Sequence, residues 1–425
     1  MAVMILLFGI VVQTDAAIAD DWVSRHGVEL GPDFELSDAA KDLISNEMRD
    51  VKVVGLGETS HGISEIFQMK SALIRFLVTE REFSLIMLEA TFGEVVYLNE
   101  YISGERDDID AILKGMPLWY FKVAEFRDLL DWLREFNATH DNRVQLFGME
   151  MQYVDRSLQQ IKAYLDTVDP VSTSVWDAFG MDRIGSATAS AKEFFYLWQP
   201  MSDDALREHV NLLVELRNAF DENKSDYVSK SSAAEYDLMR RHLVVLEQFV
   251  SAAMQSDERI KHQMRDYFMF LNVQWTRSYC ESPKTIVWAH NEHVWKQHGN
   301  GGYDVLGRQL DKAYGESYFA LGFDFGEGTY RAPGEDGWLH DVPKPVDGSL
   351  TSHMSRLGSP NYLLNIRSGL RANEPIPDTV TMRASSGGYT PMRNGQIYYD
   401  RNYSLTDRYD ALIFLNRASP PTMLD

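Results

Sequence analysis

Residues 52–62 read KVVGLGETSHG, a short apolar strand that runs into a glycine-rich turn. The β-branched residues at its start predict a strand that is buried on both faces. The glycines permit a sharp turn and the close approach of a substrate. Glu58 and His61, three residues apart in that turn, can point into one small space. Together these features predict an α/β fold with a ligand site where the strand ends.

Three further apolar runs end in a titratable residue. They are residues 84–88 before Glu89, residues 144–149 before Glu150 and residues 285–289 before His290. The carboxyl ends of strands in an open parallel sheet face the ligand crevice, so we expect four separate segments to deliver polar groups to one edge. A strand can also end in a polar residue simply because it reaches solvent, and that reading stays open for any one of the four.

Longer segments of helical period alternate with short apolar runs along the rest of the chain. Residues 64–79 predict a helix with Phe67, Ile74 and Leu77 on one side. Weaker strand candidates are residues 318–323, 362–366 and 411–415. We therefore predict an α/β fold with a mainly parallel central sheet flanked by helices, within a single catalytic domain over residues 20–425.

Two regions depart from this alternation. Residues 155–276 lack convincing strands and show helical periodicity, so we expect a large helical insertion that could cover a substrate cleft. Residues 326–359 are rich in Gly and Pro and are expected to be connecting structure. The sequence contains no internal repeat of solenoid period, which argues against a repeat protein.

Composition and charge exclude several classes of function. Hydrophobic residues make up 44% of the chain and aromatic residues 12%, which is typical of a packed globular protein. The formal net charge of −22 repels phosphate backbones and anionic membranes. We therefore expect a small-molecule substrate, no nucleic-acid partner and no stable membrane association. Cys280 is the only cysteine, which excludes an internal disulfide and any multi-cysteine metal site.

The N-terminal segment is similar to a secretory signal. Residues 2–12 (AVMILLFGIVV) are apolar but too few to span a bilayer, and Ala17-Ile18-Ala19 offers small residues for cleavage. Cleavage there would remove residues 1–19 as a signal peptide and place the protein outside the cell or in the periplasm. A start assigned at the wrong residue, or an N-terminal strand, is the alternative and would leave the protein in the cytoplasm.

The turn after the first strand carries the chemistry of a general base. Free imidazole has a pKa of about 6.5, so a histidine such as His61 can remove a proton from water near neutral pH. Glu58 would fix the imidazole tautomer and steady the imidazolium that forms. Ser60 is a poor candidate nucleophile, because adjacent residues on a turn seldom aim their side chains at each other. A capping histidine and a salt-bridged glutamate are the structural alternatives.

The fourth strand ends in Trp288-Ala289-His290-Asn291-Glu292-His293, which adds two imidazoles to the same edge. His290 could act as a second acid or base or stabilise an oxyanion, and His293 could simply pack. His and Glu also suit a divalent metal, but His-x-x-His is not the His-Glu-x-x-His motif of zinc proteases. The sequence has no Gly-x-Ser-x-Gly nucleophile elbow, no phosphate-binding loop and no dinucleotide fingerprint after a strand.

Six ordered motifs, spread over most of the chain, resemble the erythromycin esterase family. They lie at residues 55–62, 65–70, 88–90, 147–152, 265–273 and 288–294. The resemblance implies that a His-activated water hydrolyses the cyclic ester of macrolide antibiotics, or a related ester. It assigns His61 as the general base, with Glu58, Glu89 and His290 as the site residues around it.

The resemblance also implies auxiliary residues. Lys70 stands where the family has a basic residue, often Arg, nine positions after the histidine. There it would balance the carboxylates or hold a carboxylate or carbonyl of the substrate. Glu150 stands where many relatives have Asp. In the expected mechanism Glu58 orients His61, His290 or Lys70 stabilises the oxyanion, and Glu89 supports the network.

Two alternatives stay open at this point. In one, Glu58, His61, Glu89 and His290 bind a divalent ion that lowers the pKa of water. In the other, the chain is a non-enzymatic module for haem or another ligand, and paired histidines ligate iron. A haem-binding lipoprotein would need a cysteine after its signal, and none is present. We expect an ester hydrolase without a cofactor.

Overall fold

The apolar strand before the glycine-rich turn forms as predicted, inside the sheet of the first of two units. β2 spans Val53–Leu56, and all four of its residues are buried. It pairs in parallel with β5 (Thr285–Trp288) on one side and with β6 (Tyr318–Gly334) on the other. Both edges of the strand are paired and all its side chains are buried, which explains why its sequence is a continuous apolar run.

The computed structural model describes residues 22–170, 202–299, 301–334, 337–342, 344–357, 361–372, 379–383, 392–393, 396–397 and 399–424. The first unit comprises Met1–Ser84, Tyr120–Trp132 and Pro283–Asp425, and the second comprises Leu85–Trp119 and Leu133–Ser282. Residues 1–19, for which we predict a signal peptide, lie outside the described residues. Among the helices that are described, none combines the length and the hydropathy needed to cross a bilayer.

Parallel strands form the middle of the sheet in the first unit, and antiparallel strands form its edge. β13 (Ala411–Ala418) runs parallel to β6, β8 (Asn361–Asn365) is antiparallel to β13, and β1 (Gly27–Glu29) is antiparallel to β8. The three weaker strand predictions are therefore confirmed. Two small antiparallel pairs lie in the same unit: β9 (Val380–Arg383) with β12 (Tyr399–Tyr403), and β10 (Met392–Arg393) with β11 (Gln396–Ile397).

The prediction that residues 326–359 only connect other elements is wrong. β6 continues to Gly334, and the chain folds back on it as the antiparallel strand β7 (Gly337–Val342). The prediction took glycine as a sign of a loop, whereas glycine in this region allows two strands to pack closely. A Cβ on Gly328 would lie 2.0 Å from the carbonyl oxygen of Ala418 on β13. Only glycine allows so close an approach of the two strands at this position.

Helices connect these strands, and the longest that lies wholly in the first unit is the one predicted after β2. α3 spans Ser64–Arg81, and Phe67, Ile74 and Leu77 are all buried on it, as expected from their spacing. The other described helices of the unit are short. They are α2 (Asp38–Glu47), α13 (Asn291–Val294), α14 (Leu306–Tyr314), α15 (Leu350–Ser355), α16 (Ile366–Arg371) and the 3-10 turns η1 (Pro32–Phe34) and η3 (Gly315–Ser317).

The second unit contains the other two predicted strands, which run parallel to each other. β3 spans Leu85–Thr91 and β4 spans Gln145–Glu150. Each strand includes the glutamate that was expected just beyond its end. α4 (Phe92–Ser103) packs against β4, and α5 (Ile109–Gly115) follows it. η2 (Trp119–Phe121) and α6 (Ala124–Thr139) lie at the boundaries of the Tyr120–Trp132 segment.

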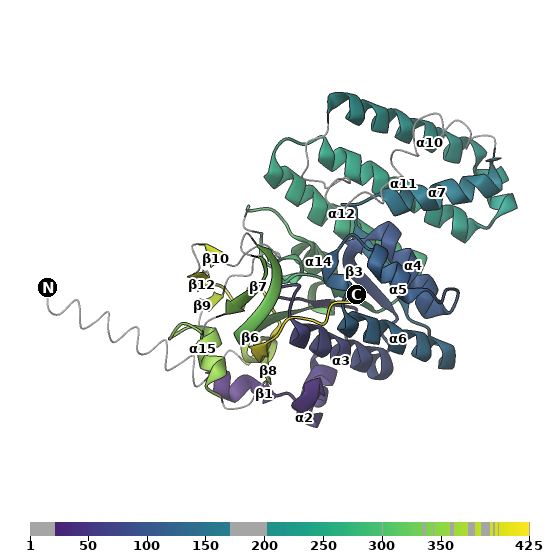
Figure 1. Cartoon of the computed structure of the whole chain (residues 1–425). Coiled ribbons are helices and arrows are strands. Elements are labelled where there is room, and N and C mark those ends of the chain that lie inside the picture. The colour runs from purple at the N-terminus through teal and green to yellow at the C-terminus, as the bar shows by residue number, and fades with distance from the viewer. Residues whose placement is uncertain are drawn as a thin grey trace, which may run out of the picture. The chain divides into compact units, whose positions relative to one another are not determined.

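The described part of residues 155–276 is helical, as predicted. Its helices are α7 (Asp155–Val168), α10 (Asp203–Lys230), α11 (Ala233–Ala253) and α12 (Glu258–Tyr279). α11 packs against the other three (Figure 1). Ser232 caps α11 and Asp257 caps α12, because their side chains accept the unpaired backbone N–H groups of the first turns. The predicted α/β class with a helical insertion is therefore confirmed, whereas the single catalytic domain stays a prediction.

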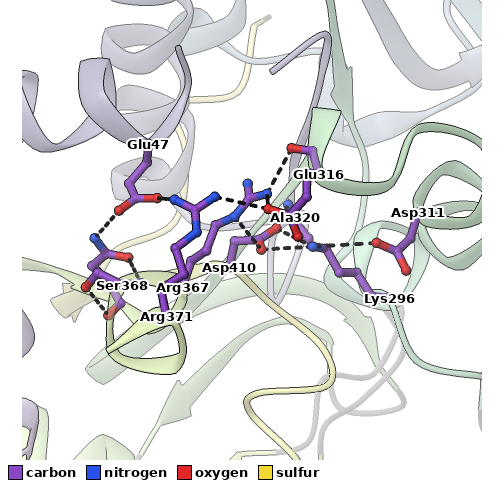
Figure 2. A network of polar contacts seen from close by, with 10 residues as sticks. Glu47, Lys296, Asp311, Glu316, Ala320, Arg367, Ser368, Arg371 and Asp410 are labelled. Atoms are coloured by element: carbon purple, nitrogen blue, oxygen red, sulfur yellow. Dashed lines mark hydrogen bonds and ion pairs between the residues drawn. The ribbon is translucent and has the colours of Figure 1, made fainter. Parts of the chain in front are cut away.

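An ion-pair network surrounds Asp410 at the amino ends of β6 and β13 (Figure 2). The carboxylate of Asp410 accepts a hydrogen bond from Lys296 Nζ at 2.8 Å and one from the backbone N–H of Ala320 at 2.8 Å. Its backbone carbonyl accepts the N–H groups of Ile366 and Arg367 at the start of α16. Asp410 is only 6% exposed. One buried residue therefore ties the start of β13 to β6 and to α16.

We expect Asp410→Asn to lower the free energy of unfolding by roughly 1.5–3 kcal/mol, because Lys296 would lose its charged acceptor. Asp311→Asn is the matched control. Asp311 lies 3.6 Å from the same ammonium, but its side chain is 35% exposed, and we expect a change of less than about 1 kcal/mol. Urea unfolding of the three proteins measures both effects. An Asp410→Asn protein as stable as the wild type would contradict the role of the network.

Candidate functional site

Close contacts at two glycines, one with a side chain and one with backbone, hold the turn after β2. A Cβ on Gly57 would lie 2.2 Å from Oδ1 of Asn291. A Cβ on Gly62 would lie 1.7 Å from the carbonyl oxygen of Arg331 on β6. The N–H of Arg331 donates to the carbonyl oxygen of Gly62 at 2.9 Å. The neighbouring segments therefore fix the path of the turn. The two glycines are needed because atoms of the protein itself lie close to them, whereas the sequence predicted the close approach of a substrate.

This turn joins Glu58 to His61 by a hydrogen bond. Nδ1 of His61 is bonded to Oε1 of Glu58, and the two residues are 7% and 2% exposed. Because an ionised carboxylate can only accept, Nδ1 carries the proton and Nε2 of the neutral ring has a lone pair. Nε2 makes no hydrogen bond with any residue that the structure describes, and the His61 side chain keeps 9% exposure. The turn therefore presents an oriented base.

Lys70 and Trp288 hold the other oxygen of the Glu58 carboxylate. Nζ of Lys70 donates to Oε2 of Glu58 at 2.5 Å, and Nε1 of Trp288 donates to the same oxygen at 2.9 Å. Burial would raise the pKa of Glu58, but the charge of Lys70 and then that of His61, with hydrogen bonds from both, lower it to about 2. Glu58 is therefore ionised near neutral pH.

Lys70 balances this carboxylate from a position that solvent does not reach. Its side chain is 0% exposed, and its ammonium lies 4.5 Å from the centre of the Trp288 ring. Of the two roles that the sequence left open for Lys70, charge balance fits this position, because a substrate carbonyl would have to displace Glu58 to reach it. The cation–π contact adds to the stabilisation of the buried charge.

His290 lies beside His61 and is the N-cap residue of α13. The centres of the two rings are 5.4 Å apart. Nε2 of His290 is 3.2 Å from the carbonyl oxygen of Thr59, and Nδ1 accepts the N–H of Glu292 at 3.4 Å, so Nε2 carries the proton. His293 is half-buried on the same helix, where its N–H donates to the carbonyl oxygen of His290. The structure thus brings His290 to His61.

Glu89 and Glu150 form a second group, in the second unit. Nη2 of Arg265 lies 2.6 Å from Oε1 of Glu89 and also contacts Oε1 of Glu150. All three residues are buried. Burial would lower the pKa of Arg265, but Glu150 and then Glu89 raise it above its ordinary value. The sequence gave Arg265 no role, although two buried carboxylates at strand ends require a cation, and this arginine lies in one of the six motifs.

Within each unit, the structure brings two of the four predicted strand-end residues together. Glu58 and His290 come together in the first unit, and Glu89 and Glu150 come together in the second. That all four strands supply one site stays a prediction.

The sequence also missed an aromatic contact to His61. The ring of Tyr120 stacks on His61 with 4.1 Å between the ring centres and 12° between their planes. In residues 118–121, Tyr120 lies between a tryptophan and a phenylalanine, a pattern typical of a hydrophobic core. The local sequence therefore gave no sign that Tyr120 contacts His61.

The donor set fits a cation poorly. Within the described ranges no group of three or more His, Cys, Asp or Glu residues could hold a metal ion. The ammonium of Lys70 already supplies a positive charge beside Glu58, and like charges repel. Both ring nitrogens of His290 are hydrogen-bonded, which also disfavours it as an iron ligand.

Comparison with known proteins identifies the family. A family model described as Erythromycin esterase matches residues 78–418. This chain belongs to the erythromycin esterase family. The matched range includes Glu89, Glu150, Arg265 and His290, while the turn with Glu58 lies before it.

Individual relatives agree with membership of the erythromycin esterase family. The erythromycin esterase type II of Escherichia coli is 24% identical over 360 residues, which are 78% of this chain and 84% of that protein. YbfO of Bacillus subtilis (strain 168), named provisionally as a hydrolase, is 22% identical over 425 residues and covers 95% of this chain and 92% of its own. The solved structure of a mutant of the erythromycin esterase EreC, in its open conformation, has a TM-score of 0.67 at 16% identity. That match covers 94% of this chain and 99% of the other, and it supports the shared fold. The family and these relatives make the chain a hydrolase.

The lowered pKa of Glu58 predicts how stability depends on pH. Because the folded-state pKa of about 2 lies below the unfolded value of 4.5, the ionised carboxylate contributes stability that is full above pH 4.5 and lost as the pH falls toward 2. Glu58→Gln cannot take up this proton. We therefore expect the variant to be less stable than the wild type near neutral pH, and the gap in free energy of unfolding to narrow as the pH falls from about 6 to about 3.

Glu327→Gln, at an exposed position on β6, is the control, and its small gap should not change with pH. Urea unfolding at several pH values gives each gap. A Glu58→Gln gap that is the same at every pH would contradict the lowered pKa.

Proposed function

We propose that this hydrolase cleaves a carboxylic ester with His61 as the general base for a water molecule. The observation that carries the proposal is the pair of bonds at His61: Nδ1 is bonded to the buried carboxylate of Glu58, while Nε2 has no hydrogen-bond partner among the described residues. Nε2 takes a proton from water, the hydroxide attacks the ester carbonyl, and Glu58 stabilises the imidazolium. His61 then returns the proton to the leaving alkoxide.

The charge balance around Glu58 keeps that proton on His61. With its pKa lowered to about 2, Glu58 does not accept the proton from the imidazolium. Lys70 compensates the carboxylate in the resting state, so the site does not bury an unpaired charge. The proton is therefore available to the leaving group once the acyl bond to oxygen breaks.

His290 is the proposed donor to the oxyanion. Its Nε2–H makes a long bond of 3.2 Å to the carbonyl oxygen of Thr59, and exchange of this acceptor for the developing negative charge would strengthen the bond. Its ring lies beside that of His61, so one carbonyl group could reach both. Lys70 is buried behind Glu58 and is assigned no contact with substrate.

The proposed substrate is the macrolactone of a macrolide antibiotic or a related ester. Membership of the erythromycin esterase family and the relative named erythromycin esterase type II support this choice. Opening a lactone adds one water: the acyl carbon gains a hydroxyl, and the ring oxygen leaves as an alcohol. We propose a small-molecule substrate with no cofactor, no nucleic-acid partner and no stable membrane association, and the net charge supports the last two. Residues 2–12 support a location outside the cell or in the periplasm.

We expect His61→Asn to lower kcat on an ester that the wild type opens by about a hundredfold or more, because the variant lacks the base. A panel of macrolides is incubated with each protein, and mass spectrometry detects the gain of one water. His298→Asn changes an exposed histidine that pairs with Asp304 and serves as the control, with turnover close to that of the wild type.

A folded His61→Asn protein with near-normal turnover would rule out the proposed base. The same assay after removal of divalent ions by a chelator should give unchanged turnover. Loss of turnover that zinc or magnesium restores would favour the metal-assisted mechanism instead.

A further inference from the structure

We propose that Tyr120 is a positioning residue for His61, and that residues Ser419–Leu424, here called the strap, hold Tyr120 in place. The inference rests on the proposed function of His61 as the base. It assigns a catalytic consequence to a segment far from the turn in sequence. All residues in the argument belong to the first unit.

The stacked ring supplies a constraint that the Glu58 bond cannot. A single hydrogen bond at Nδ1 fixes the direction of that atom but restricts the tilt of the imidazole plane less. Tyr120 covers one face of the ring, with 4.1 Å between centres and 12° between planes, and the two residues are 9% and 7% exposed. A flat, buried ring at that distance restricts the tilt of the imidazole plane and keeps Nε2 pointing in one direction. Misplacing a catalytic group by about 1 Å can cost two orders of magnitude in rate.

Tyr120 begins a short segment, Tyr120–Trp132, that belongs to the first unit. In the sequence, this segment is flanked on both sides by parts of the second unit. Within residues 85–282, only Tyr120–Trp132 belongs to the first unit. Phe121 packs on Phe126 with 4.8 Å between ring centres, and Phe126 meets Trp288 edge to face at 5.9 Å. Trp288 is the residue that donates to Glu58. The segment therefore rests on the same aromatic support as the carboxylate.

The strap binds this segment through its backbone. Val123 and Met423 form an antiparallel bridge. The N–H of Ala124 donates to the carbonyl oxygen of Thr422 at 2.8 Å, and the N–H of Leu424 donates to that of Lys122 at 2.9 Å. Backbone pairing of this kind fixes the position of the residues beside it, and Tyr120 precedes Lys122 by two positions.

The other end of the strap is bonded to the first turn of α3, which follows His61 directly. The carboxylate of Glu65 accepts the N–H of Ser419 at 2.7 Å and its hydroxyl at 2.6 Å. The N–H of Ser64 donates to the carbonyl oxygen of Ser419 at 2.8 Å. Between Ser419 and Thr422 stand Pro420 and Pro421, whose fixed φ angles stiffen the strap and reduce the entropy lost on ordering it.

Glu125 joins the two ends. Its carboxylate accepts the N–H of Thr422 at 3.1 Å and the hydroxyl of Ser64 at 2.6 Å. One side chain thus links the strap, the start of α3 and the segment that carries Tyr120. The segments that carry the base and its stacking partner are fixed to each other by these bonds, in addition to the stack itself.

The test replaces the ring by an aliphatic side chain. We expect Tyr120→Leu to lower kcat about tenfold or more while KM changes less than about twofold, because the substrate still binds but the base is misaligned. Tyr120→Phe keeps the stacked ring and should recover most of the loss. In protein labelled with ¹³C-histidine, the ring signal of His61, assigned by its absence in His61→Asn, should move downfield in Tyr120→Leu because the ring current of the stacked phenol is lost.

A matched control is available in the second unit. Phe136 stacks on His140 with 4.0 Å between centres and 10° between planes. Phe136→Leu removes an equivalent ring, and we expect it to shift the signal of His140 and to leave kcat unchanged. A kcat loss of equal size in this control would mean that Tyr120→Leu acts through general destabilisation, which would overturn the proposal.

Glu125→Leu tests the strap and also serves if Tyr120→Leu does not fold. It removes the acceptor for Thr422 and Ser64, and we expect a fall in kcat with little change in KM and a shift of the His61 signal in the same direction. Unchanged kcat and an unchanged His61 signal in a folded variant would overturn the proposal. The NMR shift reports the stack without any substrate, so failure of the positioning role is distinguishable from failure of His61 as the base.

Discussion

The buried carboxylate of Glu58 is the point on which the site depends. Three donors satisfy it: the imidazole of His61, the ammonium of Lys70 and the indole of Trp288. They come from the turn after β2, from α3 and from β5, so the packing of these three elements keeps the carboxylate ionised although it is buried. An isolated charge in this position would be neutralised by a raised pKa. The fold and the chemistry are thus coupled through one charge.

The second unit solves a similar problem with the opposite stoichiometry. Two carboxylates, Glu89 and Glu150, share the cation Arg265. In the first unit, by contrast, Lys70 and His61 both bind the single carboxylate of Glu58. In both arrangements a glutamate at or after the end of a strand is buried, and a buried carboxylate needs a paired cation. In the first unit the pairing leaves Nε2 of His61 without a hydrogen bond among the described residues, and this is the atom that we propose takes a proton from water.

Local signals in the sequence predicted the strands and the turn, because apolar runs and glycines report backbone conformation directly. Tertiary packing decided the rest. The role of Lys70 depends on its contacts with Glu58 and Trp288, neither of which lies on its helix. The contact of Tyr120 with His61 could not be predicted, because an aromatic residue next to other aromatic residues is typical of a hydrophobic core. The hairpin of β6 and β7 was missed because glycine is as typical of closely packed strands as of loops, as Gly328 illustrates. Residues 1–19, the predicted signal, lie outside the described part.

The tautomer of His61 tests the central claim most directly. In protein labelled with ¹⁵N-histidine, at a pH where the ring is neutral, the account predicts a protonated Nδ1 and an unprotonated Nε2, because Glu58 accepts from Nδ1. Assignment by comparison with His61→Asn identifies the signals. A neutral ring that carries its proton on Nε2 would contradict the account, since the atom proposed to receive the proton of water would already be occupied.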